Sequence, residues 1–209
     1  TATDPQAIEG VDSTLAFVVS QDNVSNFDTI VDVSLGNSSI EAVDIASIVY
    51  TNSAGVEVTL STTAQITAFL TNGDSIKISA GSINAPTITV TVVDDTIYEQ
   101  SEALVLNISN PTNATVGTAS ATGTILDEDQ AVNTDNPNNP DDPNDAVDGD
   151  KPVVSITGTQ RLNEVDADGN DNVATYTVSL SNISTQDTTV TITIGGGTAT
   201  TGVDYNPTT

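Results

Sequence analysis

Cysteine, histidine, methionine and tryptophan are all absent from this 209-residue sequence. Without cysteine the chain has no disulfide framework, so stability outside the cell must come from core packing or from bound metal. Without cysteine or histidine it has neither the soft ligands of a zinc or copper site nor a nucleophile–base pair built on those residues. Aromatic residues make up 3% of the chain, which is too few to line a cleft in which sugar rings stack on aromatic side chains. We therefore do not expect an enzyme.

Positive charge is also nearly absent. Lys77, Lys151 and Arg161 stand against 29 acidic side chains, and the formal net charge is −26. Nucleic acids and anionic membranes are bound by basic patches, so we expect neither as a partner. The sequence has no run of about 18 apolar residues, and we expect no direct membrane insertion. It starts at Thr1 without a signal peptide, which we interpret as a mature protein or an excised piece.

Alternation of apolar and polar residues with a period of two is the main structural pattern. It predicts strands at residues 15–19, 29–35, 46–50, 56–60, 75–79, 87–93, 104–108 and 119–126. We interpret the first two of these as paired strands, and the third and fourth as a hairpin. No segment shows a sustained period of 3.6 residues. The pattern therefore predicts an all-β fold, an immunoglobulin-like Greek-key β-sandwich.

The composition changes after the last of these strands. Residues 130–151 contain almost nothing apolar, and Pro137, Pro140 and Pro143 recur at every third residue, which is the period of a polyproline II helix. This segment is predicted to be a semi-rigid acidic linker. A disordered acidic tether is the alternative when calcium is absent.

Strands are expected again at residues 153–156, 173–181 and 188–194. The two halves repeat each other: Glu164 and residues 176–182, 189–194 and 203–205 follow the order of Glu9 and residues 17–23, 29–35 and 43–45. We therefore predict a sandwich at 1–129, a linker at 130–151 and the N-terminal half of a second unit at 152–209. Only eight residues precede Glu9, so the first unit is expected to lack a strand that matches 153–156. As an alternative, segment 153–156 fills that edge, in the same chain or in another.

A dense cluster of carboxylates precedes one of the predicted strands. Asp94, Asp95, Glu99 and Glu102 fall within nine residues. Like charges a few ångströms apart cost about 1 kcal/mol per pair even in water, so such a cluster favours a bound cation. Hard oxygen ligands favour calcium. A solvated acidic turn is the alternative.

Three motifs in this order resemble the Calx-beta domain. They are the acidic cluster at 94–102 before a strand, GTILDED at 123–129, and GTATTGVDY at 197–205 in the second unit. The Thr- and Asp-rich, cysteine-free background resembles the tandem extender repeats of large bacterial RTX-type surface adhesins.

The resemblance implies that calcium binds at one pole of the sandwich. Carried over residue by residue, the implied ligands are Glu9, Asp44, Asp95, Glu99, Glu102, Asp127 and Asp129, with Asp94 beside them. It also implies an extracellular or bacterial cell-surface protein that acts in cell adhesion and biofilms. Its partners would be calcium ions and neighbouring repeats of the same chain or of other copies, and calcium would fold and stiffen the array.

Two other functions remain open at this point. One is a self-assembling matrix or filament subunit, in which incomplete units complement one another between chains. The other is a recognition module that itself binds a glycan, a protein or an ice surface. The sequence does not specify a distal ligand.

Overall fold

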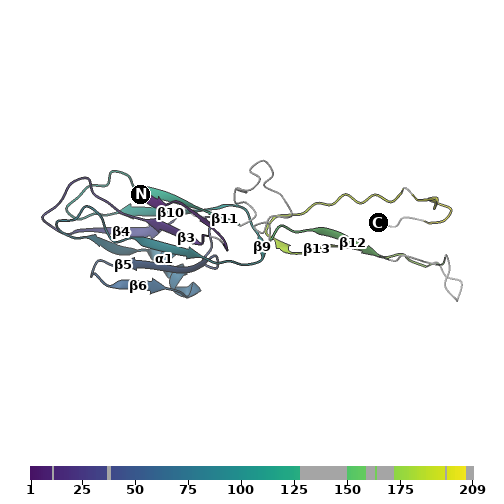
Figure 1. The fold of residues 1–209 in the computed structure, drawn as a ribbon, viewed down its shortest axis with the longest axis horizontal. Coiled ribbons are helices and arrows are strands. Elements are labelled where there is room, and N and C mark those ends of the chain that lie inside the picture. The colour runs from purple at the N-terminus through teal and green to yellow at the C-terminus, as the bar shows by residue number, and fades with distance from the viewer. Residues whose placement is uncertain are drawn as a thin grey trace.

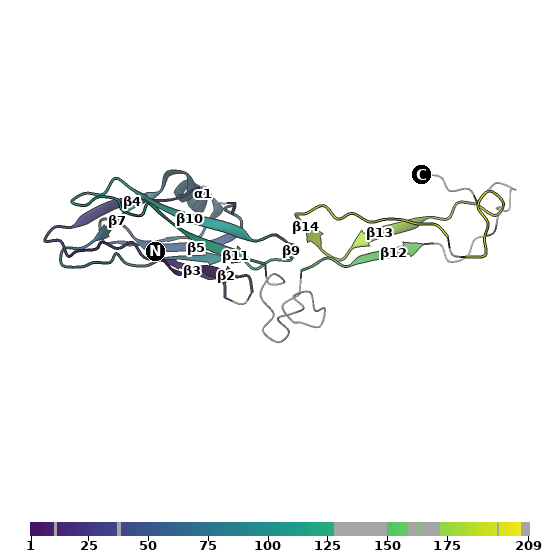
Figure 2. The ribbon, with the colours of Figure 1, turned by 90° about the horizontal axis from the view of Figure 1, so that it is seen from above.

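The computed structural model of the chain describes residues 1–10, 12–36, 39–127, 150–158, 163, 172–195 and 197–205. We call the described part of 1–127 the first unit and that of 150–205 the second unit. The two units lie end to end along the long axis (Figure 1). The short strand β9 (Ile97–Tyr98) lies at the end of the first unit that faces the second (Figure 2). The predicted linker falls outside the described residues, except for Asp150 and Lys151.

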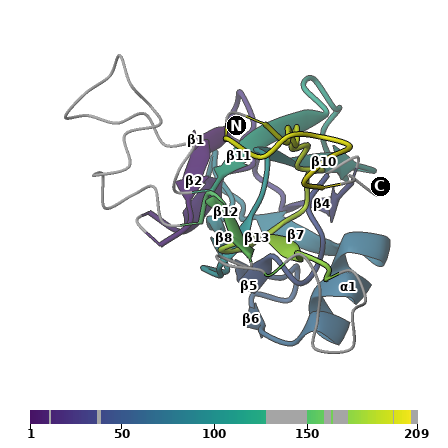
Figure 3. The same ribbon diagram turned by 90° about the vertical axis from the view of Figure 1, so that its right-hand side faces the viewer.

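Two five-stranded sheets make up the first unit. Sheet A has the order β1 (Ala2–Asp4), β3 (Thr14–Phe17), β8 (Ile88–Val92), β5 (Ile45–Thr51) and β6 (Glu57–Leu60). Sheet B has the order β2 (Gln6–Ile8), β11 (Ser120–Leu126), β10 (Glu102–Ser109), β4 (Thr29–Leu35) and β7 (Asp74–Ile78). Figure 3 looks along the long axis, with α1 on one flank of the sheets. The predicted all-β sandwich is confirmed.

The core of the first unit is built by the alternation that predicted its strands. Alternate residues of β4 and β8 are buried, among them Val31, Val33 and Val90. Each such side chain contributes about 1.5–3 kcal/mol when it is fully buried. On β11, a Cβ added to Gly123 would lie 3.0 Å from Leu15 Cδ2. The missing side chain therefore leaves room for the core residues of sheet A.

The first eight residues form the edge strand that the sequence analysis did not expect. Ala2 of β1 lies opposite Phe17 of β3, and after Pro5 the chain crosses to sheet B, where β2 pairs in parallel with β11. The expectation of a missing strand was wrong because a strand divided between two sheets needs only three residues in each. The alternative for segment 153–156 in the same chain was also wrong. That segment contributes to β12 (Val154–Gly158), which pairs with β13 (Tyr176–Leu180) of its own unit.

The predicted pairing of residues 15–19 with residues 29–35 was wrong as well. Strand β3 pairs with β1 and β8 in sheet A, whereas β4 pairs with β7 and β10 in sheet B. The connection between them crosses from one sheet to the other. Alternation shows which face of a strand is buried but not which strand lies beside it. The predicted hairpin is confirmed, because Tyr50 of β5 lies opposite Val58 of β6.

The helix α1 (Thr63–Asn72) was missed by the sequence analysis. Its N-terminus is a capping box, in which the Gln65 N–H donates to Thr62 Oγ1 at 3.3 Å and the Thr62 N–H donates to Gln65 Oε1 at 3.3 Å. Two of its residues, Ile66 and Phe69, are buried. So few buried positions give a weak 3.6-residue period, and the Thr-x-x-Gln spacing was the available indication.

The second unit is less complete in its strands. β12 and β13 form a two-stranded sheet, but the predicted strand at 188–194 is not formed. Its counterpart in the first unit, β4, lies between β7 and β10, and the described part of the second unit holds no counterpart of those neighbours. No helix in the described part of the chain has the length and apolar character that a membrane crossing requires.

Candidate metal site

The acidic loop, residues 94–102, joins β8 to β10 at the end of the first unit that faces the second. Its conformation is fixed by its own carboxylates and by the end of β11. The Ile97 N–H donates to Asp95 Oδ1 at 2.7 Å, and the Glu99 N–H donates to Asp127 Oδ2 at 2.6 Å. Asp127 is 3% exposed, so the loop closes over a buried carboxylate.

Glu9 and Asp94 lie at the same end, next to the turn that follows β2. The side chain of Glu9 is buried, and its N–H donates to the carbonyl of Leu126 at 3.0 Å. Gly10 has a φ of +66°, in the left-handed region that favours glycine, and a Cβ added there would lie 3.0 Å from Asp94 Oδ1. The absence of a side chain at Gly10 therefore leaves room for the carboxylate of Asp94.

Asp44 reaches the acidic loop from the start of β5. Its Oδ2 accepts the Glu41 N–H at 2.7 Å, and its carbonyl accepts the Val93 N–H at 2.9 Å, which ties it to the end of β8. Burial raises the pKa of Asp44 above its ordinary value. The Glu41 N–H opposes that shift, while the charges of Glu41 and Asp95 add to it.

The pKa values of Glu99 and Glu102 are raised by burial and by several neighbouring charges. Burial, followed by the charges of Asp44, Asp95, Asp127 and Glu41, raises the pKa of Glu99. Burial, together with the charges of Asp44, Glu99 and Glu41, raises the pKa of Glu102 to about 7. The ionised forms of these side chains therefore destabilise one another, and a cation placed among them would relieve that cost.

Lys77, one of the chain's three basic residues, does not serve this purpose. Its Nζ forms a salt bridge with Asp28 Oδ2 at 3.5 Å, at the other end of the first unit. Within the described ranges, no three carboxylates are arranged as a ready-made metal cage. The donor set nevertheless fits calcium in kind, because calcium takes six to eight hard oxygen ligands and these side chains offer nothing else.

The structure brings most of the predicted ligands to this end of the first unit. The charges of Asp44, Asp95, Glu99, Glu102 and Asp127 act on one another, and the carboxylate of Asp94 lies beside Gly10, the residue after Glu9. Asp129 lies outside the described residues. Sequence reasoning missed Glu41, whose charge acts on three of these groups. Its position three residues before Asp44, in the turn that Asp44 caps, was the available indication.

A second group of acidic side chains lines a polar cavity of about 370 Å³ beside β4 and β7. Asp32 accepts the Ser75 hydroxyl at 2.6 Å and the Asn110 amide at 3.0 Å, and these bonds hold its pKa below the ordinary value. Asp74 accepts the Tyr50 hydroxyl at 2.6 Å. These carboxylates are satisfied by neighbouring donors of the fold.

Comparison with curated proteins gives no match. Among solved structures, the chain is similar to CBD12 from CALX1.2 (16% identity, TM-score 0.39) and to calcium binding domain CBD12 of CALX1.1 (14% identity, TM-score 0.40). Each alignment covers 58% of this chain, and this chain spans 40% of the length of each of those structures. It is also similar to the CsuC–CsuE chaperone–tip adhesion subunit complex of Acinetobacter baumannii (13% identity, TM-score 0.34), over 78% of this chain and 73% of that one.

A sequence model of the Calx-beta domain matches residues 13–129 and 150–209, which together make up most of the chain. The two matched stretches contain both units and leave out most of the predicted linker. Domains of this family are non-catalytic binding modules that typically bind calcium. The chain belongs to the Calx-beta domain family.

Proposed function

We propose that this chain is a calcium-binding extender module of a secreted or cell-surface bacterial adhesin. The observation that carries the proposal is the mutual destabilisation of the ionised side chains of Asp44, Glu99 and Glu102, whose pKa values are raised by burial and by neighbouring carboxylates. Calcium supplies the positive charge that the residues of this pole need in order to lie close together. The proposed ligands are Glu9, Asp44, Asp94, Asp95, Glu99, Glu102, Asp127 and Asp129.

The chain's own residues contribute position and charge to this site. The Glu99 N–H holds Asp127 over the end of β11. The Val93 N–H holds the Asp44 carbonyl at the end of β8, while the Glu41 N–H donates to the Asp44 carboxylate. Four separate segments of the first unit therefore supply carboxylates to one pole. In the unfolded chain these segments are far apart, so an ion bound by all of them stabilises the folded state.

The energetics suit an extracellular module. Calcium sites in such modules have dissociation constants of about 10⁻⁴–10⁻³ M, and ligand at 100 times its dissociation constant stabilises the folded state by about 2.7 kcal/mol. A chain exported unfolded from a low-calcium compartment would then fold on reaching calcium-rich medium. Stiff repeats would hold a distal binding module away from the cell.

The test is a thermal melt by circular dichroism, first in EGTA and then across a calcium titration. We expect calcium to raise the melting temperature of the wild type and to have little effect on the double variant Glu99→Gln/Glu102→Gln. The matched control is Asp22→Asn/Glu57→Gln, which removes the same number of charges outside the acidic loop. A wild-type melt that ignores calcium, or a control as insensitive as the double variant, would contradict the proposal.

A self-assembling filament or matrix subunit is the second candidate, and one observation favours it. The second unit exposes apolar side chains that its fold would be expected to cover, among them Tyr176 (62% exposed) and Ile192 (68% exposed). Incomplete units of two chains could cover each other. Sedimentation velocity with and without calcium distinguishes the two functions, because an extender module stays monomeric across concentrations at which a filament subunit grows.

A further inference from the structure

The second unit contacts the acidic pole of the first through a short parallel strand pair. Strand β14 (Ile183–Ser184) lies beside β9, with Ile183 opposite Ile97 and Ser184 opposite Tyr98. The Thr185 N–H donates to the carbonyl of Tyr98 at 3.1 Å. Strand β9 lies inside the acidic loop. The loop of the second unit that contains β14 therefore contacts the candidate metal site of the first unit (Figure 2).

The loop that makes this contact has a counterpart in the first unit. Residues 182–187 have the sequence NISTQD, and residues 23–28, at the equivalent place in the repeat, have the sequence NVSNFD. Both loops contain the same serine turn. The Gln186 N–H donates to Ser184 Oγ at 2.9 Å, and the Phe27 N–H donates to Ser25 Oγ at 3.0 Å. The two loops therefore share a local geometry.

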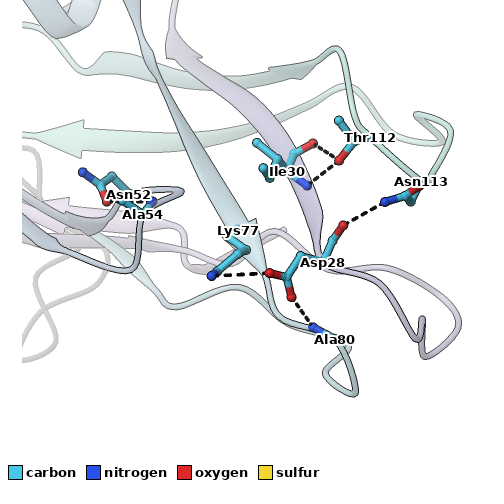
Figure 4. A network of polar contacts seen from close by, with 8 residues as sticks. All are labelled: Asp28, Ile30, Asn52, Ala54, Lys77, Ala80, Thr112 and Asn113. Atoms are coloured by element: carbon cyan, nitrogen blue, oxygen red, sulfur yellow. Dashed lines mark hydrogen bonds and ion pairs between the residues drawn. The ribbon is translucent and has the colours of Figure 1, made fainter.

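The loop at 23–28 lies at the pole of the first unit opposite the acidic loop, and neighbouring turns hold it in place. Asp28 Oδ1 accepts the Ala80 N–H at 2.8 Å, and the Asp28 carbonyl accepts the Asn113 side-chain amide at 3.0 Å (Figure 4). Lys77 pairs with the Asp28 carboxylate and places one of the chain's three basic side chains at this pole. A loop fixed in advance loses little entropy when it binds a partner.

The same pole is unusually apolar at its surface. Val24 and Phe27 are 62% and 69% exposed, and Ile83 and Val116 of the adjoining turns are 45% and 39% exposed. The Ile83 carbonyl accepts the Gln21 N–H at 2.9 Å, so the turn that contains Ile83 lies next to the start of this loop. Within the described structure the Asn26 N–H makes no hydrogen bond. The donor equivalent to that of Thr185 is therefore available.

We propose that the loop at 23–28 is a docking element for the acidic-loop strand of another Calx-beta unit. Val24 and Asn26 would take the places that Ile183 and Thr185 hold on β9. The partner is a segment like Ile97–Tyr98 with flanking carboxylates, and the units meet head to tail. The inference rests on the repeated loop and its observed contact, and does not depend on the calcium proposal.

Within one chain, the second unit already occupies β9. A tethered partner acts at an effective concentration of about millimolar, so a second chain competes poorly unless this contact is opened. Thr185→Pro removes the N–H that donates to Tyr98 and so frees β9 on the full-length chain. Asn26→Pro removes the equivalent donor from the proposed docking loop.

The chain has no cysteine, so an introduced thiol is unique. We would mix full-length Val24→Cys with full-length Ile97→Cys/Thr185→Pro, add a short bismaleimide and quantify the heterodimer by mass spectrometry. The matched control is Val56→Cys, an exposed valine outside the loop (57% exposed). We expect about fivefold more heterodimer from Val24→Cys than from Val56→Cys, the factor that one hydrogen bond supplies, and a loss of that excess when Asn26→Pro is added.

Each chain is first checked by circular dichroism for the wild-type strand content and melt. The cross-linking is run both in calcium and in EGTA, so that a failure of the calcium proposal leaves the result interpretable. An excess from Val24→Cys in either buffer that Asn26→Pro abolishes supports the docking element. Equal yields from Val24→Cys and Val56→Cys in both buffers, or an excess that survives Asn26→Pro, overturn it.

Discussion

The two units carry the same apolar pattern and bury it to very different extents. Phe17 is fully buried in the first unit, whereas its counterpart Tyr176 is 62% exposed. Val33 is 1% exposed, and Ile192, in the matching strand pattern of the second unit, is 68% exposed. Alternation therefore specifies a face that is ready to be buried. Burial itself requires the neighbouring strands that the first unit draws from residues 45–126.

Local features, in contrast, are the same in both units. Asp44 Oδ2 accepts the Glu41 N–H at 2.7 Å, and Asp204 Oδ2 accepts the Thr200 N–H at 2.7 Å. The serine turns of the two docking loops also match. Turns within a few residues form without the rest of the sandwich, whereas the core and the acidic pole depend on segments that are far apart in the sequence.

The largest expected difference between the units lies in the core. Phe17→Ala should lower the free energy of unfolding of the first unit by about 3–5 kcal/mol, because it opens a cavity among buried side chains. Tyr176→Ala should change the free energy of unfolding by no more than about 0.5 kcal/mol, because its side chain is largely in solvent. Urea denaturation followed by circular dichroism measures both. Similar losses in the two variants would show that the second unit is packed in solution.

The next difference concerns the two matched aspartates. Asp44→Asn should weaken calcium binding about tenfold, since it removes a charged ligand, whereas Asp204→Asn should leave binding unchanged. Asparagine Oδ1 still accepts the local N–H in each turn, so both variants keep their backbone conformation. The calcium concentration that gives half of the rise in melting temperature is the measurement. An equal change in both variants would place part of the site in the second unit.

A smaller change in the free energy of unfolding is expected from variants in α1, the helix that follows Asp44 in the first unit. Thr62→Ala removes the capping box of α1 and should cost about 1 kcal/mol. Thr67→Ala, at an exposed position inside the same helix, should be neutral or slightly stabilising because alanine is the better helix former. Equilibrium unfolding in urea distinguishes the variants, and a cost shared by both would argue against the cap.

The smallest expected effect is that of pH on calcium-free protein. The folded-state pKa of Glu102 is raised from 4.5 to about 7, and those of Glu99 and Asp44 are also raised. Their contribution to stability is therefore present below the unfolded pKa and is lost as the pH rises through about 7. The melting temperature in EGTA should rise by a few degrees from pH of about 8 to about 5, because solvent screens these half-exposed groups.

Calcium should reverse this pH dependence, because it binds the deprotonated carboxylates and acidification would displace it. The control is Glu102→Gln, whose melt in EGTA should vary less with pH than that of the wild type. A calcium-free melting temperature that falls from pH of about 8 to about 5 would mean that the carboxylates are not held close together.

The sequence predicted the fold class because alternation is a local property of each strand. It failed where the outcome depended on partners at long range. The strands containing Phe17 and Val31 were predicted as a pair, although they lie in different sheets. The strand formed by the first eight residues was missed because each of its two parts is only three residues long.

The candidate site shows the same division between local and long-range information. The cluster at 94–102 was evident because its carboxylates are close together in the sequence. The resemblance to Calx-beta domains brought in Glu9, Asp44 and Asp127, which no local pattern connects to that cluster. Glu41 was missed because its charge matters only once its turn reaches Glu99 and Glu102.

The division of the first strand between two sheets has a mechanical consequence. β2 at the start of the first unit and β11 at its end lie side by side and run in parallel. The Thr124 N–H donates to the Pro5 carbonyl at 2.8 Å, and the Glu9 N–H donates to the Leu126 carbonyl at 3.0 Å. A pull on the two ends of this unit would load the whole strand pair in shear. Its hydrogen bonds would then resist together instead of opening one by one, and the unit would act as a clamp under tension.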